Sequence, residues 1–174
     1  MINGDNSVYT DLKMMLNTIK NKTVCFTGHR IIDGDHSAEM RSKLYSVVMS
    51  LINDGCDTFI CGGAMGFDTE AAECVINLRE RCPHIKLLLF LPCRDQTAKW
   101  KSGVLLSKYK SILGKADGVF YVSDFYQSGC MHQRNRSMAD ASSVCVAYMK
   151  KSAGGTGYTV SYAEKHGVRV INLA

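Results

Sequence analysis

Short apolar runs alternate with segments of helical periodicity along this chain. Each run is too short for a helix and is rich in Val, Ile, Leu, Phe or Cys, a pattern typical of buried strands. We expect strands at 23–27, 58–61, 86–91, 118–122, 144–148 and 168–173. The run at 86–91 is almost unbroken and is followed by Pro92, which predicts a strand that is buried on both faces and ends at the proline.

Between these runs, apolar side chains recur every three or four residues, which predicts amphipathic helices. Gly55 and Gly167 follow two of these segments, at the position of a helix C-cap. We expect a further short helix after Arg134 and Asn135, and a leading helix over 8–20. The remaining expected helices cover 44–52, 67–78, 105–113 and 156–166.

The alternation of strands and helices predicts an α/β fold: a Rossmann-like doubly wound, mostly parallel sheet of about six strands with helices on both faces. The chain has 174 residues and shows no internal repeat or long linker, so we expect a single domain over 1–174, with 1–21 as a leading helical segment. In such sheets, ligands bind beyond the carboxyl ends of the strands, where the strand order reverses.

Gly, Arg, His and Asn residues gather directly after the expected strands. The glycine turn 62–66 leads from one strand into a helix, and the turn 154–156 does the same near the C-terminus. Such turns present backbone N–H groups and a positive helix end, which suit a phosphate or another anion. The residues that we expect to bind a ligand are Gly28, His29, Arg30, Gly62, Gly63, Gly66, Asp68, Arg134, Asn135, Gly154, Gly155 and Thr156.

Several of these residues also have a purely structural interpretation. The glycines of the turn 62–66 serve either a phosphate or a tight strand-to-helix turn with close packing. Asp68 either interacts with the helix dipole, worth about 0.3–1 kcal/mol, or accepts hydrogen bonds from a ribose hydroxyl or acts as a base. Asp68 and Glu70 are the candidate catalytic residues, although Glu70 also fits a solvated position.

The same alternatives apply to the remaining polar residues. Arg134 suits a bidentate phosphate contact, or an internal salt bridge to Asp117 or Asp140. His29 is either a general acid or a hydrogen-bonding residue of its loop. Thr156 offers a hydroxyl to a ligand or caps its helix.

Composition narrows the classes of partner. The net charge of +5 comes from 21 basic and 16 acidic residues that form no dense basic block, so we do not expect nucleic acid as the partner. No apolar run reaches the roughly 20 residues of a membrane span. The 8 cysteines show no metal-binding spacing and fit a reducing cytoplasm, so we expect no metal site. We also expect no cofactor.

Three of the remaining side chains have open alternatives. Trp100 either stacks on a base or belongs to the core. Cys93 and Cys130 lie near the expected cleft, where a nucleophilic cysteine beside His132 is conceivable, but packing is the simpler interpretation.

Five motifs in one order resemble the YpsA-like (DUF1273) branch of the SLOG superfamily. They are Thr27-Gly28-His29-Arg30, Gly62-Gly63-x-x-Gly66-x-Asp68, Pro92 with Gln96 and Trp100, Gly129-Cys130-Met131 with Arg134-Asn135, and Gly154-Gly155-Thr156 with Thr159. The resemblance implies a Rossmann-like fold that binds nucleotides or nucleotide-derived ligands, and by analogy a homo-oligomer, but no reaction. Relatives in the superfamily include LOG phosphoribohydrolases, DNA-processing proteins such as DprA, and sensor domains for nucleotide signals.

The phosphoribohydrolases carry the motif Pro-Gly-Gly-x-Gly-Thr-x-x-Glu, whose glutamate assists the chemistry. Here Ala153, Tyr158 and Ser161 replace its proline, threonine and glutamate. Our leading hypothesis is therefore a cytoplasmic protein that senses, sequesters or processes a phosphate-bearing nucleotide or ADP-ribose-like ligand. The alternatives are an N-glycosidic hydrolase of nucleoside monophosphates that uses Asp68 or Glu70, and an adaptor whose partner is a protein.

Overall fold

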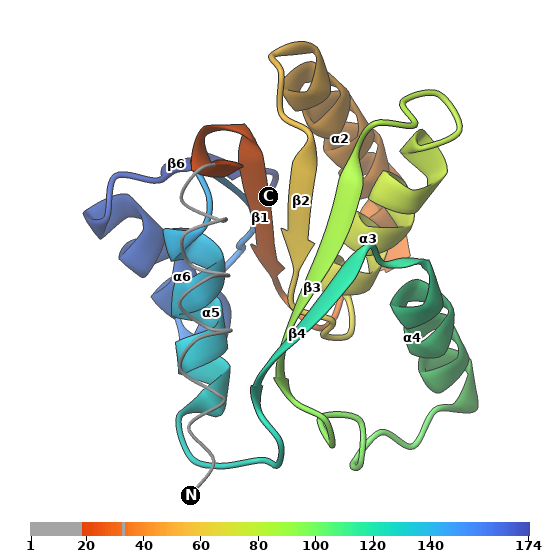
Figure 1. Ribbon diagram of the computed structural model, residues 1–174, viewed down its shortest axis with the longest axis vertical. Helices are drawn as coiled ribbons and strands as arrows, with labels where there is room; N and C mark the ends of the chain where they lie inside the picture. The colour runs from red at the N-terminus through yellow and green to blue at the C-terminus, as the bar shows by residue number, and fades with distance from the viewer. Residues whose placement is uncertain (1–18, 33) are drawn as a thin grey trace, which may run out of the picture.

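A computed structural model describes residues 19–32 and 34–174 and contains one six-stranded sheet, in which every pair of neighbouring strands is parallel (Figure 1). The strand order is β4-β3-β2-β1-β5-β6. The strands are β1 (Thr23–Gly28), β2 (Thr58–Cys61), β3 (Lys86–Cys93), β4 (Gly118–Ser123), β5 (Val144–Tyr148) and β6 (Arg169–Asn172). This confirms the predicted doubly wound α/β fold. The expected leading helix falls almost wholly outside the described residues, and only the short turn η1 (Lys20–Lys22) precedes β1.

Helices cover both faces of the sheet (Figure 1). Three of them pack on one face: α2 (Gly34–Asn53), α3 (Phe67–Leu78) and α4 (Gly103–Lys115). The other face carries α5 (Cys130–Asp140) and α6 (Gly154–Lys165). Among the described residues, no helix combines the length and the apolar character needed to cross a membrane.

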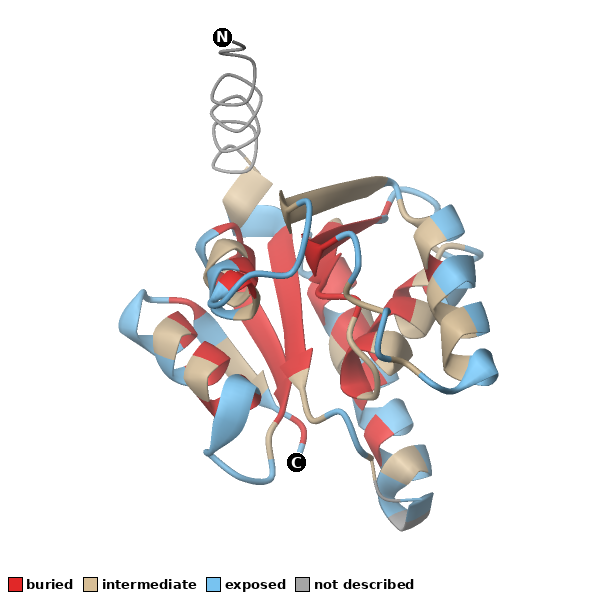
Figure 2. Ribbon diagram, turned by 90° about the horizontal axis from the view of Figure 1, so that it is seen from below, coloured by how far each residue is buried: buried red, intermediate tan, exposed pale blue. Residues whose placement is uncertain are grey.

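The core forms because successive residues of a strand point to opposite faces. In β3, Leu87 and Leu89 pack toward α2 and α3, while Leu88 and Phe90 pack toward α5 and α6. The central strands are therefore buried throughout, as Figure 2 shows, and an unbroken apolar run is the sequence pattern that such a strand requires.

Strand β3 continues through Pro92 to Cys93, so the expectation that it ends at the proline was wrong. The ladder between β2 and β3 ends where Cys61 pairs with Leu89. Beyond that point β3 has only β4 as a neighbour, with Cys93 opposite Ser123. A proline without an N–H is tolerated there because one side of the strand no longer carries a ladder.

The strand order reverses at β1, which lies between β2 and β5. The connections from β1 and β2 run over one face of the sheet and that from β5 runs over the other, so the loops diverge at the carboxyl ends of β1 and β5. This divergence is the place where doubly wound sheets bind ligands.

Candidate functional site

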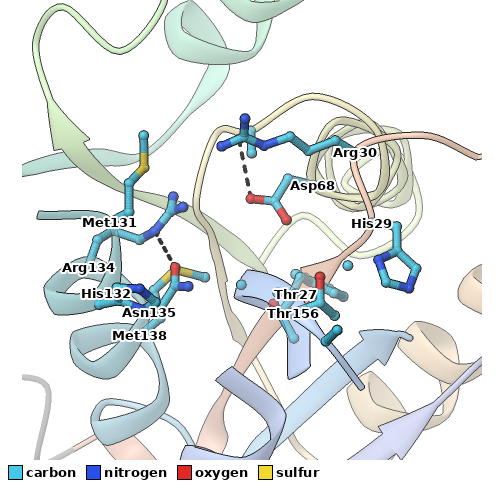
Figure 3. A pocket seen from close by; sticks show the side chains of 16 residues that line it. Thr27, His29, Arg30, Asp68, Met131, His132, Arg134, Asn135, Met138 and Thr156 are labelled. Atoms are coloured by element: carbon cyan, nitrogen blue, oxygen red, sulfur yellow. Dashed lines mark hydrogen bonds between the residues drawn. The ribbon is translucent and has the colours of Figure 1, made fainter. Parts of the chain in front are cut away.

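A cleft of about 360 Å³ opens at the carboxyl edge of the sheet beside the end of β1. In Figure 3, Arg134 and Asn135 on α5 face Arg30 and Asp68, with Thr27 and Thr156 between the two sides. We call this cleft the α6 lobe. Of the residues expected to bind a ligand, it is lined by Gly28, His29, Arg30, Asp68, Arg134, Asn135, Gly154, Gly155 and Thr156, whereas Gly62, Gly63 and Gly66 do not line it.

The glycines of the first turn are required by packing. A Cβ atom on Gly62 would overlap the guanidinium of Arg134, and one on Gly66 would overlap the carbonyl of Arg30. Gly66 also has a φ of 75°, a conformation that favours glycine. The structure therefore gives these glycines the close-packing role that the sequence left as an alternative.

The anion position of the first turn is taken by the protein's own carboxylate. Asp68 is 6% exposed, and its Oδ2 accepts a hydrogen bond from the N–H of Ala64 at 3.3 Å. Burial raises the pKa of the Asp68 carboxyl above its ordinary value, while Arg134 and backbone hydrogen bonds from Ala64 and Gly62 act in the opposite direction. This carboxylate therefore occupies the N–H groups of Ala64 and Gly62, two of the donors that we expected a phosphate to use.

Arg134 is a buried cation of helix α5, also 6% exposed, and not a residue between a strand and a helix as we expected. Its Nη1 donates hydrogen bonds to the carbonyl oxygens of Gly62, directly after β2, and of Phe90 within β3. Burial lowers the pKa of its guanidinium and the charge of Asp68 raises it. The partner of its charge is thus Asp68, rather than Asp117 or Asp140.

Asn135 links α5 to α6. Its Oδ1 accepts from the Nε of Arg134 at 2.7 Å, and its Nδ2 donates to the Oγ1 of Thr159 at 2.8 Å. Thr159 in turn donates to the carbonyl oxygen of Gly155 at 2.8 Å. This chain of hydrogen bonds fixes the first turn of α6 relative to Arg134, so Asn135 contributes to the cleft mainly as a positioning residue.

The N-terminus of α6 is the open anion position of the cleft. Ala153 occupies the N-cap position and makes no side-chain capping bond. The N–H groups of Gly154, Gly155 and Thr156 have no hydrogen-bond partner among the described residues. No heavy atom lies within 4 Å of where a Cβ of Gly154 or Gly155 would be, so a ligand can approach the backbone.

Two threonine hydroxyls lie beside this helix end. Thr27 and Thr156 line the cleft and are each 8% exposed. Neither hydroxyl has a hydrogen-bond partner in the part of the chain that the structure describes. Thr156 is the third residue of α6 and not its cap, so its hydroxyl remains available to a ligand.

His29 and Arg30 differ in their availability. The Nε2 of His29 accepts hydrogen bonds from the backbone N–H groups of Lys150 at 2.9 Å and Lys151 at 3.3 Å. His29 therefore links the loop after β1 to the loop after β5. Arg30 is exposed at the mouth of the cleft, and its guanidinium has no hydrogen-bond or salt-bridge partner among the described residues. Arg30 acts on Asp68 only through its charge, so its guanidinium remains available to a ligand at the mouth of the cleft.

Glu70 does not reach the cleft. Its carboxylate forms a salt bridge with Arg41 of helix α2, with 2.6 Å between Nε and Oε2. It lines a separate surface depression with Glu73 and Lys108. Because Glu70 lies two positions after Asp68 on a helix, its side chain points away from the one that lines the cleft.

The cysteines near the cleft are packing residues. Cys93 and Cys130 are 0% and 1% exposed, and burial, with a hydrogen bond to Asp95, raises the pKa of the Cys93 thiol to about 12. A thiol of that pKa holds almost no thiolate at neutral pH, which argues against Cys93 as a nucleophile, and burial argues against Cys130. The described residues also contain no cluster of three or more His, Cys, Asp or Glu side chains that could hold a metal ion.

We therefore predict that iodoacetamide at pH 8 leaves Cys93 and Cys130 unmodified in the folded protein. Both should be modified in urea, because their protection comes from burial. Peptide mass spectrometry measures the modification, with the partly exposed Cys82 as the internal control. Rapid modification of Cys93 under native conditions would reinstate the nucleophile hypothesis.

The α6 lobe also contains residues that were not among the expected ligand-binding residues: Phe26, Thr27, Met131, His132, Met138 and Ala153. Thr27 was detectable, because it has the same parity in β1 as Cys25, which faces α5 and α6. A polar side chain on that face, at the carboxyl end of a central strand, lies beyond the apolar core and faces the cleft. Met131 belongs to one of the five family motifs, but neither Met131 nor Met138 suggested contact with a ligand, because methionines on a helix usually indicate core.

Comparisons with known proteins agree with the fold. Residues 31–170 match the profile of the YspA SLOG family. The SPbeta prophage-derived protein YoqJ of Bacillus subtilis is 31% identical over 140 residues, covering 73% of this chain and 81% of that protein. A UPF0398 protein of Halalkalibacterium halodurans is 28% identical over 121 residues, covering 68% of this chain and 64% of the relative.

The fold is also similar to that of DNA processing protein A (DprA) from Streptococcus pneumoniae, with a TM-score of 0.61 and 15% sequence identity. The superposition covers 90% of this chain but only 51% of DprA, so this chain spans about half the length of that protein. At this identity the similarity concerns the fold alone. The family profile, which covers most of this chain, confirms the resemblance inferred from the five motifs.

Proposed function

This chain belongs to the YspA SLOG family, and we propose that its cleft binds a phosphate-bearing ribonucleotide derivative, ADP-ribose-like ligands included. One observation carries the proposal: the N-terminus of α6 opens into the cleft with unpartnered N–H groups and two free threonine hydroxyls beside it. A phosphate accepts hydrogen bonds from both kinds of donor and interacts favourably with the helix dipole.

The charges of the cleft support an anionic ligand. Asp68 balances Arg134 inside the protein, and Arg30 remains as an exposed cation at the mouth. A carboxylate offers about four lone-pair positions, so Asp68 can also accept a hydrogen bond from a ribose hydroxyl at the cleft wall. The proposal therefore moves the phosphate from the first glycine turn to the second and keeps the ribose near Asp68.

We favour binding over N-glycosidic hydrolysis because the candidate carboxylates are committed elsewhere. Glu70 pairs with Arg41 outside the cleft, and Asp68 is held by Arg134 and by the turn that precedes α3. All eight cysteines are unpaired, which is typical of a reducing compartment, so we propose that the protein acts in the cytoplasm as a sensor or a sequestering protein.

Replacing Thr156 by valine tests the phosphate position. The variant keeps the shape of the side chain and removes a hydroxyl that has no protein partner, so its melting temperature should not change. A hydrogen bond to a charged group is worth about 1.5–3 kcal/mol, so ribose 5-phosphate, AMP and ADP-ribose should bind about 10- to 150-fold more weakly. Titration calorimetry measures these affinities.

Ser161→Ala is the matched control, because it removes an exposed hydroxyl from the same helix. Its affinities should equal those of the unaltered protein. Equal loss in both variants would place the phosphate elsewhere. Absence of binding by the unaltered protein to any of the three compounds would refute the proposed function.

A further inference from the structure

A second cavity of about 490 Å³ adjoins the α6 lobe. The two cavities share Arg30, Ala64, Met131 and Arg134, so they are parts of one continuous cleft. Figure 3 labels three of these shared residues, Arg30, Met131 and Arg134, around the α6 lobe. We call the second part the tryptophan lobe, after the residues that only it contains: Met65, Lys99, Trp100 and Tyr126 among others.

The indole of Trp100 packs against Tyr109 of helix α4. Its ring meets the edge of Tyr109 with 5.4 Å between ring centroids and planes at 70°. Gln96, which lines the same lobe, donates from its Nε2 to the carbonyl oxygen of Gly63 at 3.0 Å. A Cβ on Gly63 would lie 3.4 Å from the ring of Tyr109, so the first glycine turn packs against the residues that support the indole.

Tyr126 enters the same lobe from the connection between β4 and α5. Its backbone N–H donates to Asp95 Oδ1 at 2.9 Å, which ties this connection to the loop after β3. The tyrosine is 62% exposed although it lines a cavity. An aromatic ring that is anchored by its backbone and open to solvent is available for contact with a planar ligand group.

We propose that the tryptophan lobe receives the base of the nucleotide whose phosphate lies at α6. This inference rests on the proposed function and extends it to the aromatic half of the ligand. Trp100 and Tyr126 offer π surfaces for stacking, and Arg30 lies between the base and the phosphate, where it can neutralise the linking phosphates. Each part of the cleft has the volume of a small-molecule pocket, which favours a free nucleotide over a nucleic-acid strand.

Tryptophan fluorescence tests the inference directly, because Trp100 is the single tryptophan of the chain. AMP and ADP-ribose should quench its emission as they bind. Ribose 5-phosphate carries no base, so it should bind in calorimetry without quenching. The same three titrations therefore separate occupation of the tryptophan lobe from occupation of the α6 lobe.

Replacing Trp100 by leucine supplies the second measurement. Stacking on an aromatic side chain is worth about 1–3 kcal/mol per base, so AMP and ADP-ribose should bind about 5- to 150-fold more weakly. The affinity for ribose 5-phosphate should not change. Phe125→Leu is the matched control, because Phe125 is an exposed aromatic residue that lines neither lobe. Ribose 5-phosphate binding also shows that the Trp100 variant is folded.

The outcomes discriminate between the two proposals. Calorimetric binding of all three compounds without quenching by either nucleotide would overturn the base position and leave the proposed function intact. Equal weakening of ribose 5-phosphate and AMP in Trp100→Leu would give the indole a purely structural role and also overturn it. Quenching by a single-stranded oligonucleotide alone would replace the small ligand by nucleic acid. Absence of any binding would refute both proposals together.

Discussion

Replacing Arg134 by methionine is expected to lower the free energy of unfolding by about 3–5 kcal/mol. The change removes the buried cation next to Asp68 and leaves that carboxylate uncompensated in a site where it is 6% exposed. It also removes the hydrogen-bond donor to the carbonyl oxygens of Gly62 and Phe90. Urea unfolding followed by circular dichroism measures the loss.

The Asp68→Asn, Arg134→Met double variant separates charge from packing. Because the asparagine is neutral, the double variant should be more stable than the sum of the two single losses predicts. Arg94→Met is the control, because Arg94 pairs with Asp124 on the surface, where both side chains are more than half exposed. Its effect should stay within about 0.5 kcal/mol. A loss at Arg134 as small as that at Arg94 would contradict the buried pair.

Replacing Gly66 by alanine is expected to cost about 2–5 kcal/mol of unfolding free energy. The φ of 75° strains any side chain at this position, and the added Cβ overlaps the Arg30 carbonyl. The loop after β1 cannot retreat freely, because the N–H of Phe67 donates to the carbonyl oxygen of His29 at 3.1 Å. Denaturant unfolding again gives the magnitude.

Gly155→Ala is the matched control for stability. Its Cβ would have no heavy atom within 4 Å and its φ is not positive, so the substitution should leave stability unchanged or raise it by up to about 1 kcal/mol. A similar cost for the two glycines would contradict the distinction between a packed first turn and an open second turn. The contrast therefore tests the assignment of the anion position without any ligand.

The sequence was sufficient for the fold because its signals are local. The unbroken apolar run of β3 requires burial on both faces, and the periodic apolar positions of α2 and α3 require burial of one helix face. The alternation of strands and helices then restricts the sheet to a few topologies. The sequence also predicted that the polar loops lie together, because the carboxyl ends of parallel strands meet at one edge of the sheet. Nine of the twelve predicted ligand residues accordingly line the α6 lobe.

Only the tertiary structure distinguishes the two glycine turns, through the groups that surround their N–H donors. Both turns look alike as strings of residues, but their N–H groups differ in what already occupies them. Asp68 folds back on the first turn because the buried Arg134, distant in sequence, lies opposite it, whereas no side chain caps α6. Whether a backbone N–H group is free depends on side chains that lie near it in the fold. Those side chains come from other strands and helices, so the local sequence of a turn does not predict them.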